Sequence, residues 1–164
     1  MAQSAPAALA LAAAAALCIA ASPPKPGSAA PPFALPVIAN GRGDVSLASL
    51  RGHPVYINFF ASWCGPCKDE GSRLSSFARA FGARGIQTIG IATLDSVAGA
   101  KAFAATYHLR YPILLDRTGA VGAAYGVAEL PTQVFISATG AVALWGSSEM
   151  TPSGAASALR ILSP

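Results

Sequence analysis

The stretch VYINFFASWCGPC, residues 55–67, decides the fold. Its first half is an apolar run with one polar member, Asn58, which is typical of a strand buried on both faces of a sheet. Its second half places Cys64 and Cys67 where that strand gives way to a helix predicted over 65–81. The free N–H groups of a helix start favour a thiolate, which is the nucleophile of disulfide exchange. The stretch therefore predicts a redox-active dithiol.

Strand and helix patterns alternate on both sides of this stretch. Further strands are expected at 33–35, 45–47, 86–92, 111–115, 133–137 and 142–145, and further helices at 96–107, 118–125 and 151–162. The turn 138–140 joins the last two strands as a hairpin. This order predicts an α/β sandwich in which parallel crossovers come first and an antiparallel hairpin closes the sheet.

Composition excludes some classes of function. The chain has 164 residues, which suits one domain plus a tail, and a formal net charge of +4. Charged residues make up 11% of it, against about 25% in typical soluble domains. The basic residues are scattered, with no basic run interleaved with aromatic residues, so a nucleic-acid partner is not expected. Two isolated histidines lack ligand-like spacing to the cysteines, and no metal site is expected.

The N-terminal part divides into two segments ahead of a domain at 33–164. Residues 1–22 hold an apolar run that is shorter than the about 20 residues of a membrane span and fits a secretory signal. No Lys or Arg precedes Lys25, so the usual basic start is missing, and an uncleaved membrane anchor or an Ala-rich tail are alternatives. Cys18 lies in this run and is read as an inert small residue. Residues 23–32 are rich in proline and predict an extended linker.

Two motifs carry a resemblance to a known family. Residues 58–70, NFFASWCGPCKDE, resemble the active-site stretch of the TlpA/ResA-like branch of the thioredoxin superfamily, a redoxin branch close to AhpC/TSA proteins. Residues 126–132, GVAELPT, resemble the loop that carries the cis-proline of that superfamily. The resemblance covers most of 33–162. It implies a thioredoxin fold: a three-layer α/β/α sandwich with a mixed central sheet, an N-terminal β-hairpin extension and a central inserted βα segment.

The resemblance assigns roles around the dithiol. Cys64 would be the attacking thiolate with an exposed sulfur, and Cys67 would be buried and resolve the mixed disulfide. Gly65 and Pro66 would shape the tight start of the helix, where a proline costs no hydrogen bond. Trp63 would cover the site as an apolar lid, or simply pack against it.

A second group of residues would form the substrate groove or move protons. Pro131, if cis, would lie against the disulfide and hold the backbone of Leu130 where an extended substrate pairs with it, with Thr132 beside it. Glu129 would line the groove or be an ordinary loop residue. Glu70 would either shuttle a proton to Cys67 as a buried acid or be a solvated acid favoured by the helix dipole.

Two departures from the superfamily pattern bear on the chemistry. Asn58 stands six residues before Cys64, where many thioredoxins have an aspartate, so a buried-aspartate proton relay is excluded. Gly71-Ser72 stands where the family often has a bulky residue and a proline, which weakens the expected helix kink.

The resulting functional hypothesis is an exported thiol–disulfide oxidoreductase, periplasmic or tethered by its N-terminus, that needs no cofactor beyond the Cys64–Cys67 disulfide. The Gly-Pro dipeptide is that of thioredoxin and favours a reductant of protein disulfides. The resemblance implies apocytochrome c as one substrate and a membrane thiol-transfer protein as electron donor. Alternatives are a disulfide-forming oxidant, a soft-metal-binding protein, a domain with a vestigial disulfide, and a peroxidase. Against the peroxidase, Ala61 stands where peroxiredoxins have a threonine.

Overall fold

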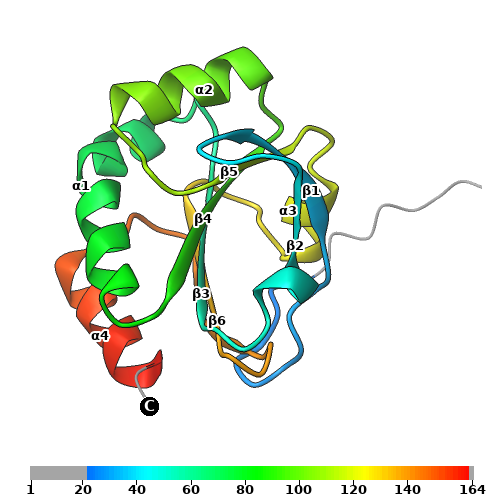
Figure 1. The fold of residues 1–164 in the computed structure, drawn as a ribbon, viewed down its shortest axis with the longest axis vertical. Coiled ribbons are helices and arrows are strands. Elements are labelled where there is room, and N and C mark those ends of the chain that lie inside the picture. The colour runs from blue at the N-terminus through cyan, green and yellow to red at the C-terminus, as the bar shows by residue number, and fades with distance from the viewer. Residues whose placement is uncertain (1–21, 163–164) are drawn as a thin grey trace, which may run out of the picture.

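A mixed seven-stranded sheet forms the centre of the molecule in a computed structural model that describes residues 22–162 (Figure 1). The strand order is β2-β1-β5-β4-β3-β6-β7, in which β3, β4 and β5 are parallel and the other neighbours are antiparallel. The strands are β1 Ala34–Ala39, β2 Asp44–Ser46, β3 Val55–Phe60, β4 Gln87–Thr93, β5 Ile113–Asp116, β6 Thr132–Ile136 and β7 Val142–Gly146. The expected order of parallel crossovers followed by an antiparallel hairpin is confirmed.

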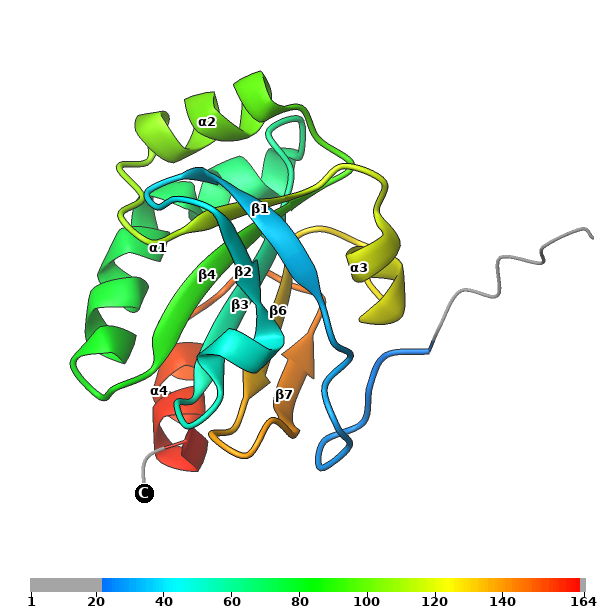
Figure 2. The ribbon, with the colours of Figure 1, turned by 45° about the vertical axis from the view of Figure 1, so that its right-hand side comes forward.

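Helices cover both faces of this sheet. On one face lie α1 Gly65–Gly82, α2 Val97–Thr106 and α4 Pro152–Leu162 (Figure 1). The other face is covered by the short α3 Ala120–Ala124 and the 3-10 helix η1 Leu47–Leu50 (Figure 2). The three layers and the inserted segment of β5 and α3 agree with the predicted thioredoxin fold, and the β1–β2 hairpin extends the sheet beyond β5.

The central strand β3 is buried along its whole length, as its apolar run predicts. Alternate side chains of a strand point to opposite faces, so Tyr56 and Phe60 pack under α1 while Ile57 and Phe59 pack toward α3. This fixes the end of β3, and with it Cys64, at the carboxyl edge of the sheet.

Two boundaries near the N-terminus differ from expectation. Leu47 ends no strand but begins η1, because the Ser46 and Ser49 side chains cap each other's backbone N–H groups. β1 extends past the expected 33–35 to Ala39, because it pairs with β5 as well as with β2.

Part of the expected linker is paired with the sheet. Gly27 N–H donates to Val142 O at 2.7 Å, and Val142 N–H donates to Ser28 O at 2.8 Å. Ala30 is buried, and the Tyr125 hydroxyl donates to Pro31 O at 2.8 Å. The packed chain thus begins ahead of Phe33. The predicted signal or anchor and Cys18 lie outside the described residues, apart from Ser22, and no helix within 22–162 is long and apolar enough to span a membrane.

Candidate active site

Cys64 and Cys67 form a disulfide at the start of α1, with their Cα atoms 5.3 Å apart. Cys64 is the N-cap residue, and its sulfur accepts the Cys67 N–H at 3.1 Å. This contact, together with the partial positive charge of the helix start, stabilises negative charge on Cys64 when the disulfide opens. Cys67 is fully buried, as expected. Cys64 is only 5% exposed, so the expectation of an openly exposed sulfur is wrong for the disulfide form.

The loop before β6 reaches the disulfide through Leu130, whereas Pro131 is not among the residues that line the groove. The Leu130–Pro131 bond is cis, as the resemblance implied, and the Cys64 sulfur lies 3.5 Å from the carbonyl oxygen of Leu130. Thr132 is buried, and its hydroxyl donates to Glu129 O at 2.7 Å. Thr132 therefore shapes the loop and does not line the groove where we expected it.

A groove of about 360 Å³ leads to Cys64. It brings together the active-site turn, the end of β4 and the loop before Pro131. Its lining residues are Trp63, Cys64, Gly65, Pro66, Thr93, Leu94, Val127, Ala128, Glu129 and Leu130. Glu129 is thus part of the groove wall, one of the two positions considered for it.

Trp63 and Leu94 form an apolar rim on this groove. Trp63 is 61% exposed and Leu94 is 58% exposed, although both are large apolar residues. The Trp63 indole N–H donates to Leu94 O at 3.1 Å, which ties the two together. Sequence reasoning missed Leu94, since nothing local distinguishes it. Its left-handed backbone, with φ of 51°, turns the chain at the end of β4.

The turn before Trp63 is held by the carboxylate of Asp95, which lies between β4 and α2. Asp95 accepts the Ser62 backbone N–H at 2.6 Å and the Ser62 hydroxyl at 2.8 Å. Gly99 on α2 leaves room for this contact, because a Cβ there would lie 2.4 Å from Ser62 Oγ. Asp95 and Gly99 thus position the active-site turn from outside the motif.

Glu70 is fully buried beneath the active site, one helical turn after Cys67. Its Oε1 accepts Asn58 Nδ2 at 2.9 Å, and its Oε2 accepts the Met150 backbone N–H at 2.7 Å. Gln133 Nε2 donates to both carboxylate oxygens at 3.2 and 3.1 Å. The structure therefore rejects the solvated acid that we considered at this position.

Burial raises the pKa of Glu70, and the hydrogen bonds from Met150, Asn58 and Gln133 oppose this shift without cancelling it. Burial also raises the pKa of the Tyr56 hydroxyl, and the nearby Glu70 carboxylate raises it further. This hydroxyl donates to Gln133 Oε1. Sequence reasoning missed Gln133, Met150 and Tyr56 as partners of Glu70, because they come from distant parts of the chain. Among residues 22–162 no group of three or more Cys, His, Asp and Glu side chains is placed to hold a metal ion.

A model of the AhpC/TSA family matches residues 26–144. The chain belongs to the AhpC/TSA family. It is similar to the thiol-disulfide oxidoreductase ResA of Bacillus subtilis, with 32% identity over 127 residues, which are 77% of this chain and 70% of that protein. With this site and this relative, the enzyme is a thiol–disulfide oxidoreductase of the ResA type.

Solved structures agree with the fold. A thiol:disulfide interchange protein DsbE of Chlorobium tepidum has a TM-score of 0.72 and 28% identity, over 84% of this chain and 94% of that one. A secreted disulfide oxidoreductase of Mycobacterium tuberculosis, homologous to DsbE, has a TM-score of 0.69 and 27% identity, over 78% and 94%. Peroxidoxin BcpB of the same species has a TM-score of 0.71 and 27% identity, over 85% and 96%.

Proposed function

We propose that this enzyme reduces disulfides of other proteins outside the cytoplasm. The observation that carries the proposal is the position of the Cys64 sulfur, at a helix start and 3.5 Å from the Leu130 carbonyl, in a groove with an apolar rim. A substrate segment that lies along the Leu130 backbone would bring its own sulfur to Cys64. The Trp63 and Leu94 side chains would contact apolar residues of that segment.

The proposed reaction transfers two electrons from the Cys64/Cys67 dithiol to a substrate disulfide, so that the enzyme becomes the disulfide and the substrate becomes the dithiol. The Cys64 thiolate attacks a substrate disulfide, forms a mixed disulfide, and releases one substrate thiolate. The Cys67 thiolate then attacks the Cys64 sulfur, which forms the Cys64–Cys67 disulfide and releases the second substrate thiolate. Two protons complete the substrate thiols. Solvent supplies one, which balances the proton that the Cys64 thiol lost to solvent when it ionised, and the other is the Cys67 proton, passed on by its acceptor. No bound cofactor is needed, because the dithiol itself carries the electrons.

Glu70 is the proposed acceptor of the Cys67 proton. It follows Cys67 by three positions, so both side chains lie on one face of α1. Burial raises the pKa of the Glu70 carboxyl group, which makes its carboxylate a better proton acceptor for a general base than an ordinary glutamate. Asn58, which has no titratable group, serves here to hold the Glu70 carboxylate.

The direction of electron flow, the partners and the location are part of the same proposal. Gly65-Pro66 between the cysteines is the thioredoxin dipeptide, which supports a reductant over an oxidant. The disulfide form of apocytochrome c is the proposed substrate, its free thiols are the product, and a membrane thiol-transfer protein is the proposed electron donor. The apolar run at the N-terminus and the secreted relative support a site of action outside the cytoplasm.

Peroxide reduction is the second candidate, because a protein named a peroxidoxin, BcpB, shares the fold. The backbone N–H of Cys64 donates to Ala61 O at 3.1 Å, and Ala61 has no hydroxyl to offer a peroxide. We expect the reduced enzyme to react slowly with hydrogen peroxide and quickly with insulin disulfides. Faster reaction with peroxide would reverse the assignment.

Trapping of a mixed disulfide tests the proposal directly. In the full chain carrying Cys18→Ser, the Cys67→Ser variant lacks the resolving thiol and should accumulate a covalent adduct with a disulfide substrate such as insulin. The matched Cys64→Ser variant should form none, because the remaining thiol is buried. Equal trapping by both variants would show that Cys64 is not the attacking residue.

A further inference from the structure

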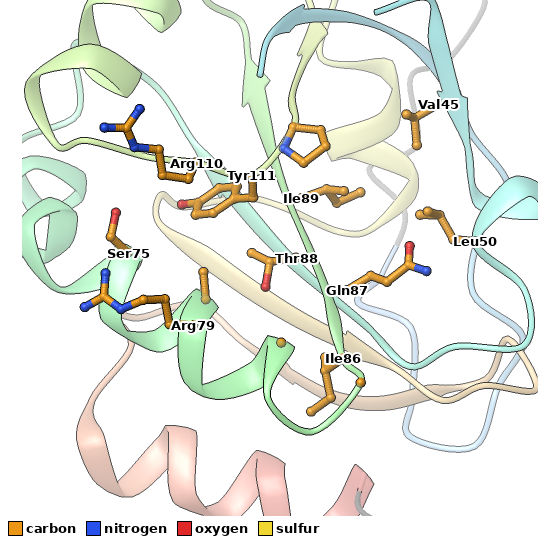
Figure 3. A pocket seen from close by; sticks show the side chains of 14 residues that line it. Val45, Leu50, Ser75, Arg79, Ile86, Gln87, Thr88, Ile89, Arg110 and Tyr111 are labelled. Atoms are coloured by element: carbon orange, nitrogen blue, oxygen red, sulfur yellow. The ribbon is translucent and has the colours of Figure 1, made fainter. Parts of the chain in front are cut away.

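A second cavity of about 540 Å³ lies away from the active-site groove, and the two share no lining residue. It is bounded by the second half of α1, the start of β4, the loop before β5, and the segment from β2 to η1 (Figure 3). Its volume lies within the range of about 300–1,000 Å³ typical of small-molecule sites. The thiol chemistry described above gives this cavity no role.

The cavity exists because one edge of β4 is open along its first half. Pairing of β4 with β5 begins at Gly90, whose N–H donates to Pro112 O at 2.9 Å. Alternate residues of a strand direct their backbone groups to opposite neighbours, so Thr88 directs its N–H and C=O toward the same side as Gly90. No described strand pairs with Thr88 on that side, and these groups border the cavity.

The half of the cavity under α1 is polar and cationic. Arg79, Arg110, Ser75 and the Tyr111 hydroxyl lie on this side (Figure 3). Within residues 22–162 the Arg110 side chain has no hydrogen bond or ion pair, and the Arg79 guanidinium donates only to the Ser76 hydroxyl, at 3.2 Å. All seven acidic residues of the chain are described, and none of them lines the cavity.

Two buried hydroxyl groups of lining residues lack a partner. They are Thr88 Oγ1 and the Tyr111 hydroxyl, and Tyr111 is 7% exposed. Buried polar groups of folded proteins are almost always hydrogen-bonded, so unsatisfied ones need an explanation. Burial, and to a lesser extent Glu70, raises the pKa of Tyr111, so this hydroxyl stays protonated and can donate to an anion.

The other half of the cavity is apolar. Val45 and Leu50 lie across the open edge from Ile89 (Figure 3). These side chains come from the hydrophobic cluster on the opposite face of the sheet. The cavity thus passes from a cationic end to an apolar end, which is the arrangement that matches an amphiphile.

We propose that this cavity binds a small organic anion with an apolar body, such as a medium-chain carboxylate. Arg79 and Arg110 hold the carboxylate as charge-assisted donors, and Tyr111 and Thr88 donate through their free hydroxyl groups. The alkyl chain lies along Ile89, Val45 and Leu50. This site is independent of the proposed disulfide reduction, because it contains neither cysteine nor any residue of the groove.

Titration calorimetry of the full chain with decanoate tests the proposal. Decan-1-ol has the same alkyl chain without the charge, and acetate has the carboxylate without the long chain. We expect decanoate to bind saturably at one site and the two partial probes to bind at least about tenfold more weakly. Arg79→Gln with Arg110→Gln should weaken decanoate at least about tenfold. Because both arginines are exposed, the double variant should fold normally, and its insulin reduction should be unchanged.

The exposed Arg160 on α4 provides a matched control, because Arg160→Gln removes the same charge at a residue that does not line this cavity. It should bind decanoate as the unmodified chain does. The proposal is overturned if decanoate shows no saturable binding, if decan-1-ol binds equally well, or if the control and the double variant lose affinity alike. If the unmodified chain bound decanoate but did not reduce insulin, that result would contradict the proposed function and still support this binding site.

Discussion

At the scale of residues, the chemistry rests on three side chains of one helix, Cys64, Cys67 and Glu70. The first caps the helix, the second is buried one turn further, and the third is a buried acid one turn beyond that. Asn58 and Gln133 hold the acid from two neighbouring strands. The Glu70 carboxylate is therefore held in place within the site, and burying its charge lowers the stability of the fold by an amount that depends on pH.

Replacement of Glu70 by glutamine should change that pH dependence. Because the folded protein holds the Glu70 proton more tightly than the unfolded chain, the stability that this proton contributes is complete below the ordinary pKa of 4.5. It is lost as pH rises through the raised pKa of the folded state. Unfolding in urea at several pH values should thus show a fall in stability above about pH 4.5 that is smaller in Glu70→Gln.

The same variant separates a proton-transfer role from a structural one. Glu70→Gln should slow insulin reduction most near neutral pH, where the carboxylate accepts the Cys67 proton, and less at high pH, where the thiol ionises without help. A uniform loss of rate at every pH would indicate that Glu70 only supports the packing beneath the disulfide.

At the scale of elements, the packing of α1 against the end of α2 explains the unusual Gly71. A Cβ at Gly71 would lie 2.6 Å from the ring of Tyr107, which itself packs on Phe103 with ring centroids 4.6 Å apart. The family pattern suggested a bulky residue here and a stronger kink. In this chain the glycine admits an aromatic ring, and the helix runs unbroken from Gly65 to Gly82.

Gly71→Ala should therefore destabilise the protein by about 1–3 kcal/mol, since the new Cβ would meet the body of the Tyr107 ring, including Cγ, and not the far end of a flexible side chain. Gly82→Ala is the matched control, because a Cβ at that exposed position meets nothing within 4 Å. It should be neutral or stabilise by up to about 1 kcal/mol. Chemical denaturation of both variants measures the difference, and equal stability of the two would refute the close packing.

At the scale of the whole molecule, the sequence predicts the fold well and the site in part. The apolar runs 54–60 and 86–92 and the motif at 63–67 predict the central strands and the dithiol, because these signals are local. The partners of Glu70 come from β3, β6 and the segment before α4, and no local pattern encodes such contacts. The open edge of β4 likewise depends on where β5 begins to pair, which only the assembled sheet determines.

The segment before Phe33 also contributes at this scale, since Pro31 accepts a hydrogen bond from Tyr125, the residue after α3, and Gly27 donates one to Val142 of β7. A chain beginning at Phe33 should be less stable than one beginning at Ser22 by about 2–4 kcal/mol, the sum of several hydrogen bonds of about 0.5–1.5 kcal/mol each. Thermal unfolding of the two chains provides the comparison. Identical midpoints would mean that the segment contributes nothing to folding.

The equilibrium reduction potential of the Cys64–Cys67 couple tests the central claim most directly. It is measured on the full chain carrying Cys18→Ala, equilibrated with dithiothreitol or glutathione buffers. We predict a value close to that of thioredoxin, about −270 mV, as a reductant of protein disulfides requires. A value near the about −120 mV of a strong periplasmic oxidant would contradict it and make the enzyme a donor of disulfides.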